Sequence, residues 1–168
     1  MVAGRAQWVV ELLRVEPTHH MLEIGCGNGT AASLIWPRLT SGTILAIDRS
    51  AAAVTRASGR NAEGIAAGRV VVRQADLADL ELPARRFHLI FAVNVNLFWT
   101  TTPADAVALV RRGLRPSGRF VLCYELPSPD RLAEYARRVT ANLEAGGLST
   151  DTTWSGANRF AISARRAR

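Results

Sequence analysis

The stretch Leu22-Glu-Ile-Gly-Cys-Gly-Asn-Gly29 decides the fold, because a short apolar run passes directly into a turn with glycine at alternate positions. Glycine has no side chain, so a ligand can approach the backbone of such a turn closely. A helix is predicted to follow over Gly29–Trp36. In α/β proteins a ligand often binds where a strand ends in a turn of this kind. The alternative is a tight connection between strand and helix that binds nothing.

Outward from this turn, helical spacing alternates with apolar runs of strand length. The predicted strands are Met21–Ile24, Thr43–Asp48, Val70–Gln74, His88–Asn94, Arg119–Tyr124, Thr150–Trp154 and Arg159–Ser163. The other predicted helices are Gly4–Val15, Ser50–Glu63 with Ser50 as N-cap, Thr102–Leu114 with Thr102 as N-cap, and one that begins at Ser128-Pro129-Asp130 and ends at Gly146-Gly147. A turn is predicted at Arg115–Gly118.

The crossover helices between these strands predict a mostly parallel sheet, because parallel strands need long connections. The short link Ser155–Asn158 instead predicts that the last two strands form an antiparallel hairpin. The fold class is therefore α/β, with a doubly wound, mostly parallel, seven-stranded Rossmann-like sheet and an antiparallel C-terminal hairpin.

The composition predicts one soluble domain over residues 1–168. No run approaches the roughly 20 apolar residues of a membrane-spanning helix. The first residues show no secretory signal, so we expect a cytoplasmic protein that does not bind membranes. Two cysteines, Cys26 and Cys123, support neither a disulfide framework nor a metal cluster, and no metal is expected. The net charge of +7 comes from arginine alone, since the chain has no lysine.

Acidic residues stand at the ends of the first three predicted strands. Glu23 precedes the glycine-rich turn, Asp48 closes the second strand, and Asp76 follows the third. At such positions Asp48 can accept hydrogen bonds from both hydroxyls of a ribose, and Asp76 can accept one from the amine of an adenine. Each acid alone could equally be a turn residue or a helix cap. Three acids in register indicate an adenosine-containing ligand.

The glycine spacing argues against a nicotinamide dinucleotide. That fingerprint needs glycine three places after its second glycine, where this chain has Thr30. Glu23 would also repel a pyrophosphate, whereas it suits a ligand with an ammonium group. S-adenosylmethionine carries both an ammonium and a sulfonium, so the residues favour it over a dinucleotide.

The chain resembles the class I S-adenosylmethionine-dependent methyltransferase superfamily over nearly its whole length. Leu22–Gly29 looks like motif I, Ile47–Asp48 like the ribose motif and Ala75–Leu77 like the adenine motif. Phe87–Asn94 resembles motif IV, and Leu114–Val121 resembles the turn into the fifth strand. The tract from Asp76 to the fourth strand is most similar to the branch that contains ubiquinone and menaquinone methyltransferases.

The resemblance implies that the chain binds S-adenosyl-L-methionine and releases S-adenosyl-L-homocysteine after transferring the methyl group to a small-molecule acceptor. The residues it implies at the cofactor are Glu23, Gly25, Cys26, Gly27, Gly29, Asp48, Arg49, Ala75, Asp76, Leu77 and Asn94. Because the sulfonium is already activated, holding the acceptor in line and excluding water can supply most of the catalysis.

A general base is optional for this reaction. His19, His20 and His88 precede or begin strands, so all three are expected at the sheet edge opposite the cofactor. Glu125, which leaves the fifth strand at the correct edge, is the candidate catalytic base, with a structural role as the alternative. The candidate substrate contacts are Trp8, Asn96, Phe98 and Trp99, although these residues could equally be core.

Other function classes stay open at this point. Arginine pairs at 85–86, 111–112, 137–138 and 165–166 favour an rRNA or tRNA methyltransferase, although the positive charge is spread. Asn94-Val-Asn-Leu97 lacks the proline-containing motif of enzymes that methylate base amines. A non-catalytic S-adenosylmethionine-binding protein is a third possibility. The chain lacks a lid segment, so a homodimer is one way to cover the acceptor.

Overall fold

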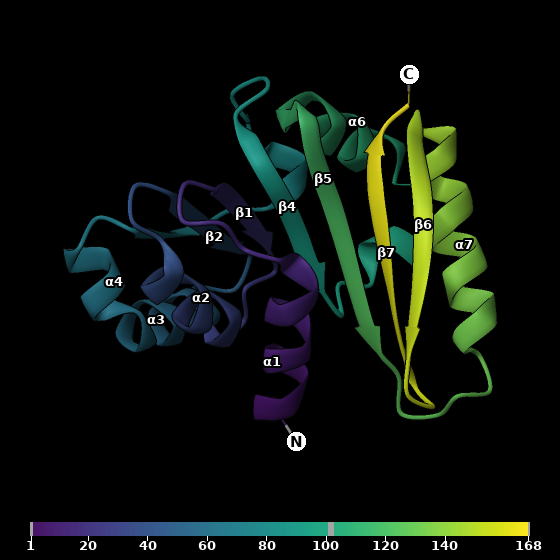
Figure 1. Cartoon of the computed structure of the whole chain (residues 1–168), viewed down its shortest axis with the longest axis horizontal. Coiled ribbons are helices and arrows are strands. Elements are labelled where there is room, and N and C mark those ends of the chain that lie inside the picture. The colour runs from purple at the N-terminus through teal and green to yellow at the C-terminus, as the bar shows by residue number, and fades with distance from the viewer. Residues whose placement is uncertain (1, 101–102, 168) are drawn as a thin grey trace. The chain divides into compact units, whose positions relative to one another are not determined.

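Seven strands alternate with helices in the computed structural model, which describes residues 2–100 and 103–167 (Figure 1). The sheet is seven-stranded, and its strand pairs are parallel except for those that involve the last two strands. The predicted α/β class with an antiparallel C-terminal hairpin is therefore confirmed. The chain divides into two compact units, Met1–Leu80 and Glu81–Arg168.

The first unit contains three parallel strands in the order β3-β2-β1. These strands are β1 (His20–Ile24), β2 (Thr43–Asp48) and β3 (Val70–Gln74). The helical elements are α1 (Val2–Leu13), α2 (Thr30–Ile35), η1 (Trp36–Arg38), α3 (Ala51–Arg60), α4 (Ala62–Ala66) and η2 (Leu77–Asp79). In the strand register Ile24 pairs with Ile47, and Asp48 pairs with Gln74. The carboxyl ends of all three strands thus share one edge, as parallel pairing requires.

The sequence predicts one helix over Ser50–Glu63, but the structure has two, α3 and α4, which are separated at Asn61. Ser50 caps α3 as expected, with its hydroxyl accepting a hydrogen bond from the N–H of Ala53 (3.3 Å). The helix ends at Arg60, since Asn61 has φ −107° and ψ 21° and α4 starts after it. Asn61 is buried, and its side chain binds two backbone carbonyls, so it serves contacts outside a regular helix.

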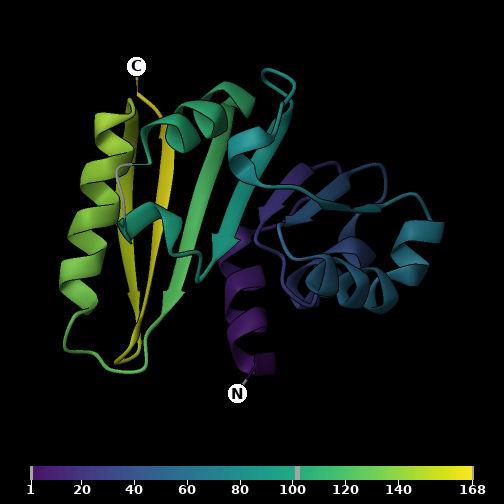
Figure 2. The same cartoon turned by 180° about the vertical axis from the view of Figure 1, so that it is seen from behind.

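The second unit contains four strands in the order β4-β5-β7-β6. These strands are β4 (Phe87–Val93), β5 (Leu114–Glu125), β6 (Leu148–Ser155) and β7 (Arg159–Arg166). The helices are α5 (Leu97–Thr100), α6 (Ala104–Gly113) and α7 (Leu132–Ala145). α6 packs on β5 and on α7, and α7 packs on β6 and β7, so both helices cover the same face of these strands (Figure 2).

The turn predicted at Arg115–Gly118 is wrong, because this stretch belongs to β5. Leu114 is fully buried, has extended backbone directly after α6, and pairs with Phe87 of β4. The next pair joins Leu89 to Arg119, so residues 115–118 bulge out of register without reversing the chain. The N-cap expected at Thr102 lies outside the described residues, and Pro103 occupies the N-cap position of α6.

Over residues 2–100 and 103–167, no helix is both long enough and apolar enough to cross a membrane.

Candidate cofactor site

The glycine-rich turn between β1 and α2 depends on left-handed backbone at alternate residues. Gly25, Gly27 and Gly29 have φ values of 70°, 56° and 73°. Side chains strain this conformation, which explains glycine at all three places. The N–H of Cys26 donates to the carbonyl of Ile47 (2.9 Å), and the N–H of Gly29 donates to the carbonyl of Cys26 (2.9 Å). Nothing lies within 4 Å of the position that a Cβ on Gly27 would take. The turn is thus firmly held yet open at its centre.

Gly29 is needed for a second reason, which is its close approach to α3. A Cβ on Gly29 would lie 2.9 Å from the Cα and Cβ of Ala57 and 2.5 Å from Nδ2 of Asn61. The small side chain of Ala57, which is fully buried, lets helix and turn come this close. The turn therefore rests on α3 with no room for a larger residue.

We expect Gly29→Ala to lower the free energy of unfolding by about 2–4 kcal/mol, because it adds both backbone strain and a clash with α3. Urea unfolding followed by circular dichroism measures this loss. Gly59→Ala is the matched control, since Gly59 lies in the same helix with nothing near its would-be Cβ. That control should be neutral or stabilising by up to about 1 kcal/mol. Equal losses in both variants would contradict the role assigned to Gly29.

Asn61 also holds the glycine-rich turn in place, and the sequence pattern did not predict this residue. Its Nδ2 donates to the carbonyls of Gly29 (3.1 Å) and Ala57 (2.8 Å), and the residue is 1% exposed. Its Oδ1 has no hydrogen-bond partner. In the sequence Asn61 is marked only as a lone asparagine in a stretch rich in alanine. The fold is needed to show that it faces Gly29.

Asp48, at the end of β2, faces the turn. Its Oδ2 accepts a hydrogen bond from the N–H of Gly27 (2.9 Å), and its Oδ1 accepts one from the N–H of Ser50 (2.9 Å). Each carboxylate oxygen can accept a second hydrogen bond. The side chain is half-buried, so it is fixed in position while still accessible. This arrangement fits the ribose-binding role expected for Asp48.

Glu23 lies on β1, just before the turn, and is 3% exposed. The pKa of its carboxyl is raised to about 8, mainly by burial and also by the negative charge of Asp48, while a backbone hydrogen bond at Ala32 acts in the opposite direction. Within residues 2–100 and 103–167, its Oε2 has no hydrogen-bond partner. A buried carboxyl with an unsatisfied oxygen is costly unless a ligand completes it. The residues therefore fit a ligand with an ammonium group, which S-adenosylmethionine has.

The third part of the site follows β3. The N–H of Ala75 donates to the carbonyl of Asp48 (3.0 Å), which ties the two strand ends together. Asp76 is exposed and caps η2, with Oδ1 accepting from the N–H of Ala78 (3.0 Å). Leu77 is 7% exposed, and Arg49 is exposed. The structure thus brings the predicted residues of the first unit to one edge.

Cys26 contributes backbone to this site. Its side chain is buried in a cluster with Ala46 and Ala57, and burial raises the pKa of its thiol to about 12. The thiol therefore stays neutral and packs as a small apolar group.

The predicted residues of the second unit make structural contacts. Asn94 has left-handed backbone (φ 53°), and its Oδ1 accepts from the N–H of Glu125 (2.8 Å), which joins the ends of β4 and β5. Oε1 of Glu125 accepts two hydrogen bonds from the guanidinium of Arg159 (2.9 and 2.7 Å). These hydrogen bonds fix the positions of Asn94 and Glu125 at the carboxyl ends of β4 and β5.

The four candidate substrate residues differ in exposure. Phe98 is fully buried, with its ring centroid 5.2 Å from that of Phe120, and Trp99 stacks on Tyr135 of α7 (4.2 Å). Asn96 is exposed just before α5, whereas Trp8 is half-buried on α1. Phe98 and Trp99 therefore pack within the second unit.

The histidines lie where the sequence predicts them. Nδ1 of His20 is 2.9 Å from Oγ1 of Thr43, at the amino ends of β1 and β2. His19 precedes β1, and His88 is the second residue of β4.

Comparison with known proteins identifies the family. A methyltransferase domain model matches residues 21–118. Trans-aconitate 2-methyltransferase of Acidovorax ebreus (strain TPSY) is 34% identical over 126 residues, which cover 73% of this chain and 45% of that protein. The chain spans about half or less of the length of the curated relatives it matches.

Solved structures with low sequence identity share the fold. A SAM-dependent methyltransferase from Aquifex aeolicus superposes with a TM-score of 0.79 at 16% identity, covering 95% of this chain and 88% of that one. Geranyl diphosphate C-methyltransferase from Streptomyces coelicolor A3(2) gives 0.77 at 14% identity, covering 99% and 81%. Because the methyltransferase domain model matches more than half of its length, the chain belongs to the class I S-adenosylmethionine-dependent methyltransferases.

Proposed function

We propose that this chain transfers a methyl group from S-adenosylmethionine to a small-molecule acceptor. The observation that carries the proposal is the pairing of Asp48 with a buried, unsatisfied Glu23 beside one glycine-rich turn. The names of two related proteins support a small acceptor, since one is a trans-aconitate and the other a geranyl diphosphate methyltransferase.

Different residues of the first unit would bind different parts of the cofactor. S-adenosylmethionine supplies a methyl group activated by its positively charged sulfur. Glu23 would bind the ammonium group, the backbone of the turn would contact the methionine part, and Asp48 would accept from the ribose hydroxyls. Asp76 would accept from the adenine amine through Oδ2, because Oδ1 already caps η2.

Catalysis would rest mainly on positioning and on exclusion of water. Glu125 is the candidate base where the acceptor must lose a proton, although Arg159 competes with that proton for Oε1. Asn96 is the exposed candidate for an acceptor contact. A single domain over residues 1–168, a cytoplasmic location and a homodimer stay predictions.

Titration calorimetry with S-adenosylmethionine, S-adenosylhomocysteine and NAD tests the cofactor. We expect saturable binding of the first two and none of NAD, because Thr30 stands where the dinucleotide fingerprint has its third glycine. Release of S-adenosylhomocysteine in the presence of trans-aconitate and other small carboxylic acids would then test the acceptor. Binding of NAD in place of S-adenosylmethionine would overturn the proposal.

A further inference from the structure

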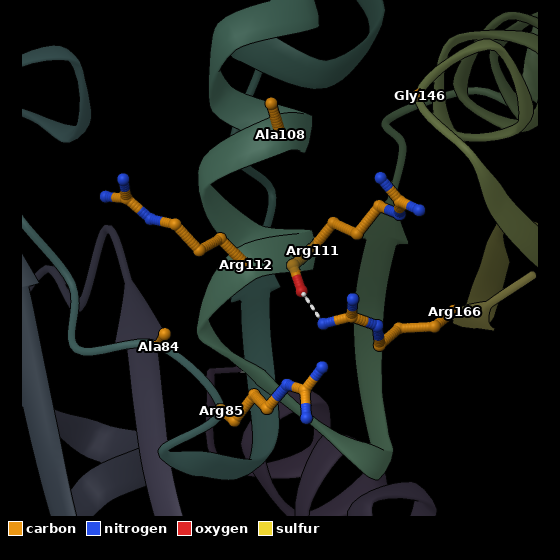
Figure 3. A pocket seen from close by; sticks show the side chains of 7 residues that line it. All are labelled: Ala84, Arg85, Ala108, Arg111, Arg112, Gly146 and Arg166. Carbon is orange, nitrogen blue, oxygen red and sulfur yellow. Dashed lines mark hydrogen bonds between the residues drawn. The ribbon is translucent and has the colours of Figure 1, made fainter.

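A pocket of about 310 Å³ lies within the second unit, and four of its seven lining residues are arginines (Figure 3). Arg85 comes from the loop before β4, Arg111 and Arg112 from the last turn of α6, and Arg166 from the end of β7. The other lining residues, Ala84, Ala108 and Gly146, are small and uncharged. The guanidinium groups are therefore the only side-chain groups in the pocket that can form hydrogen bonds.

The second unit holds most of the excess positive charge. Residues 81–168 contain thirteen arginines and seven acids, whereas residues 1–80 contain eight arginines and seven acids. Three of the four arginine pairs in the sequence contribute to this pocket. The excess positive charge therefore lies in the second half of the sequence, and the fold brings part of it together at this pocket.

Among the described residues, Arg166 is the only one of the four arginines whose side chain forms a hydrogen bond within the protein. Nη1 of Arg166 donates to the carbonyl of Arg111 (3.0 Å) and lies 3.5 Å from that of Leu114, so it caps the end of α6. Across the described ranges, no acidic side chain forms an ion pair with Arg85, Arg111 or Arg112. Like charges gathered without a counter-ion repel one another, so the folded unit would gain from a bound anion.

The pocket is separate from the strand ends that carry Asn94 and Glu125. It lies beside Phe87 and Leu114, which pair at the amino ends of β4 and β5. The seven residues of β4 place its two ends about 20 Å apart. A ligand in this pocket would therefore not be the methyl acceptor at the opposite ends of these strands.

We propose that this pocket is a binding site for a compact, multivalent phosphate anion. Guanidinium groups bind phosphate oxygens through paired hydrogen bonds, and groups from three separate segments can surround one such anion. The pocket has the volume of a small-molecule site, whereas a nucleic-acid backbone follows an extended basic groove. The bound anion would link the loop before β4, the end of α6 and the end of β7.

Isothermal titration with tripolyphosphate at constant ionic strength tests this proposal. We expect saturable binding that Arg85→Gln/Arg111→Gln weakens by about tenfold or more, since both guanidiniums are exposed and lie on the Arg166 side of the pocket, whereas Arg112 points away from it (Figure 3). The control is Arg38→Gln/Arg137→Gln, which removes the same charge from exposed positions outside the pocket and should bind within about twofold of the parent. Thermal unfolding verifies that both variants fold.

Absence of tripolyphosphate binding, or equal weakening in both double variants, would overturn the site. Titration with a short single-stranded RNA tests the alternative that the pocket binds nucleic acid. If this RNA binds through Arg85 and Arg111 and tripolyphosphate does not displace it, the site binds nucleic acid and the proposal of a compact ligand is wrong. None of these outcomes depends on whether S-adenosylmethionine binds the first unit.

Discussion

Replacing Asp48 with alanine is expected to weaken S-adenosylmethionine binding by about 100-fold, or about 2.7 kcal/mol. The variant loses a carboxylate that would accept charge-assisted hydrogen bonds from two ribose hydroxyls. It also leaves the N–H groups of Gly27 and Ser50 without their acceptor, which loosens the glycine-rich turn. Calorimetric titration of the purified variant measures the loss.

Asp79→Ala is the matched control for Asp48→Ala. Asp79 is an exposed acid in the same unit, and its side chain accepts no hydrogen bond, so this variant removes one negative charge without touching the turn. We expect its affinity to stay within about twofold of the parent. If Asp48→Ala remains folded and binds as tightly as Asp79→Ala, the ribose role of Asp48 is wrong.

The strands of the first unit could be predicted closely because periodicity alone defines them. Thr43–Asp48 is a buried or half-buried run, and Val70–Gln74 begins with three valines although three of its five residues are exposed; both have clear turn residues at their ends, and their bounds match the structure. The start of β5 could not be predicted in this way. Pro116 and Gly118 are typical of a turn, and residues 115–118 do bulge, yet pairing of Leu114 with Phe87 places this bulge inside a strand. Tertiary pairing there outweighs local preference.

The cofactor site could be predicted where residues adjacent in sequence form it. The glycine-rich turn needs only its own backbone conformation, and Asp48 follows from its place at a strand end. Contacts between distant residues could not be predicted. Asn61 reaches Gly29 across 32 positions, and Arg85, Arg111 and Arg166 meet only because β4, β5 and β7 share one sheet. Assignment to the ubiquinone branch stays a prediction.

Binding of S-adenosylmethionine at pH 7 is expected to release about one proton from Glu23. The pKa of this buried carboxyl is about 8 in the free protein, so it is mostly protonated at neutral pH. An ammonium group beside it favours the carboxylate and lowers its pKa. Affinity should therefore rise with pH by up to about tenfold per unit and level off above about pH 8. Calorimetry in phosphate and in Tris, whose ionisation enthalpies differ, counts the released protons.

Two comparisons isolate Glu23 as the source of the proton. Glu23→Gln cannot titrate, so its affinity for S-adenosylmethionine should be lower and independent of pH over this range. Adenosine lacks the ammonium group and should bind the parent protein without releasing a proton. A binding enthalpy at pH 7 that is the same in both buffers would contradict the contact between Glu23 and the ammonium.

The affinity for S-adenosylmethionine should rise with pH, whereas the free energy of unfolding of the free protein should fall. The pKa of Glu23 in the folded state, about 8, lies above the value of 4.5 expected for the unfolded chain. The folded protein therefore binds the proton more tightly, and this contribution to the free energy of unfolding is fully present below pH 4.5 and is lost as the pH rises through 8. Urea unfolding at pH 6 and at pH 8 should show the loss in the parent and not in Glu23→Gln. Because the affinity rises with pH and levels off above about pH 8, the stabilisation by a fixed concentration of S-adenosylmethionine should increase up to about pH 8 and then stay constant.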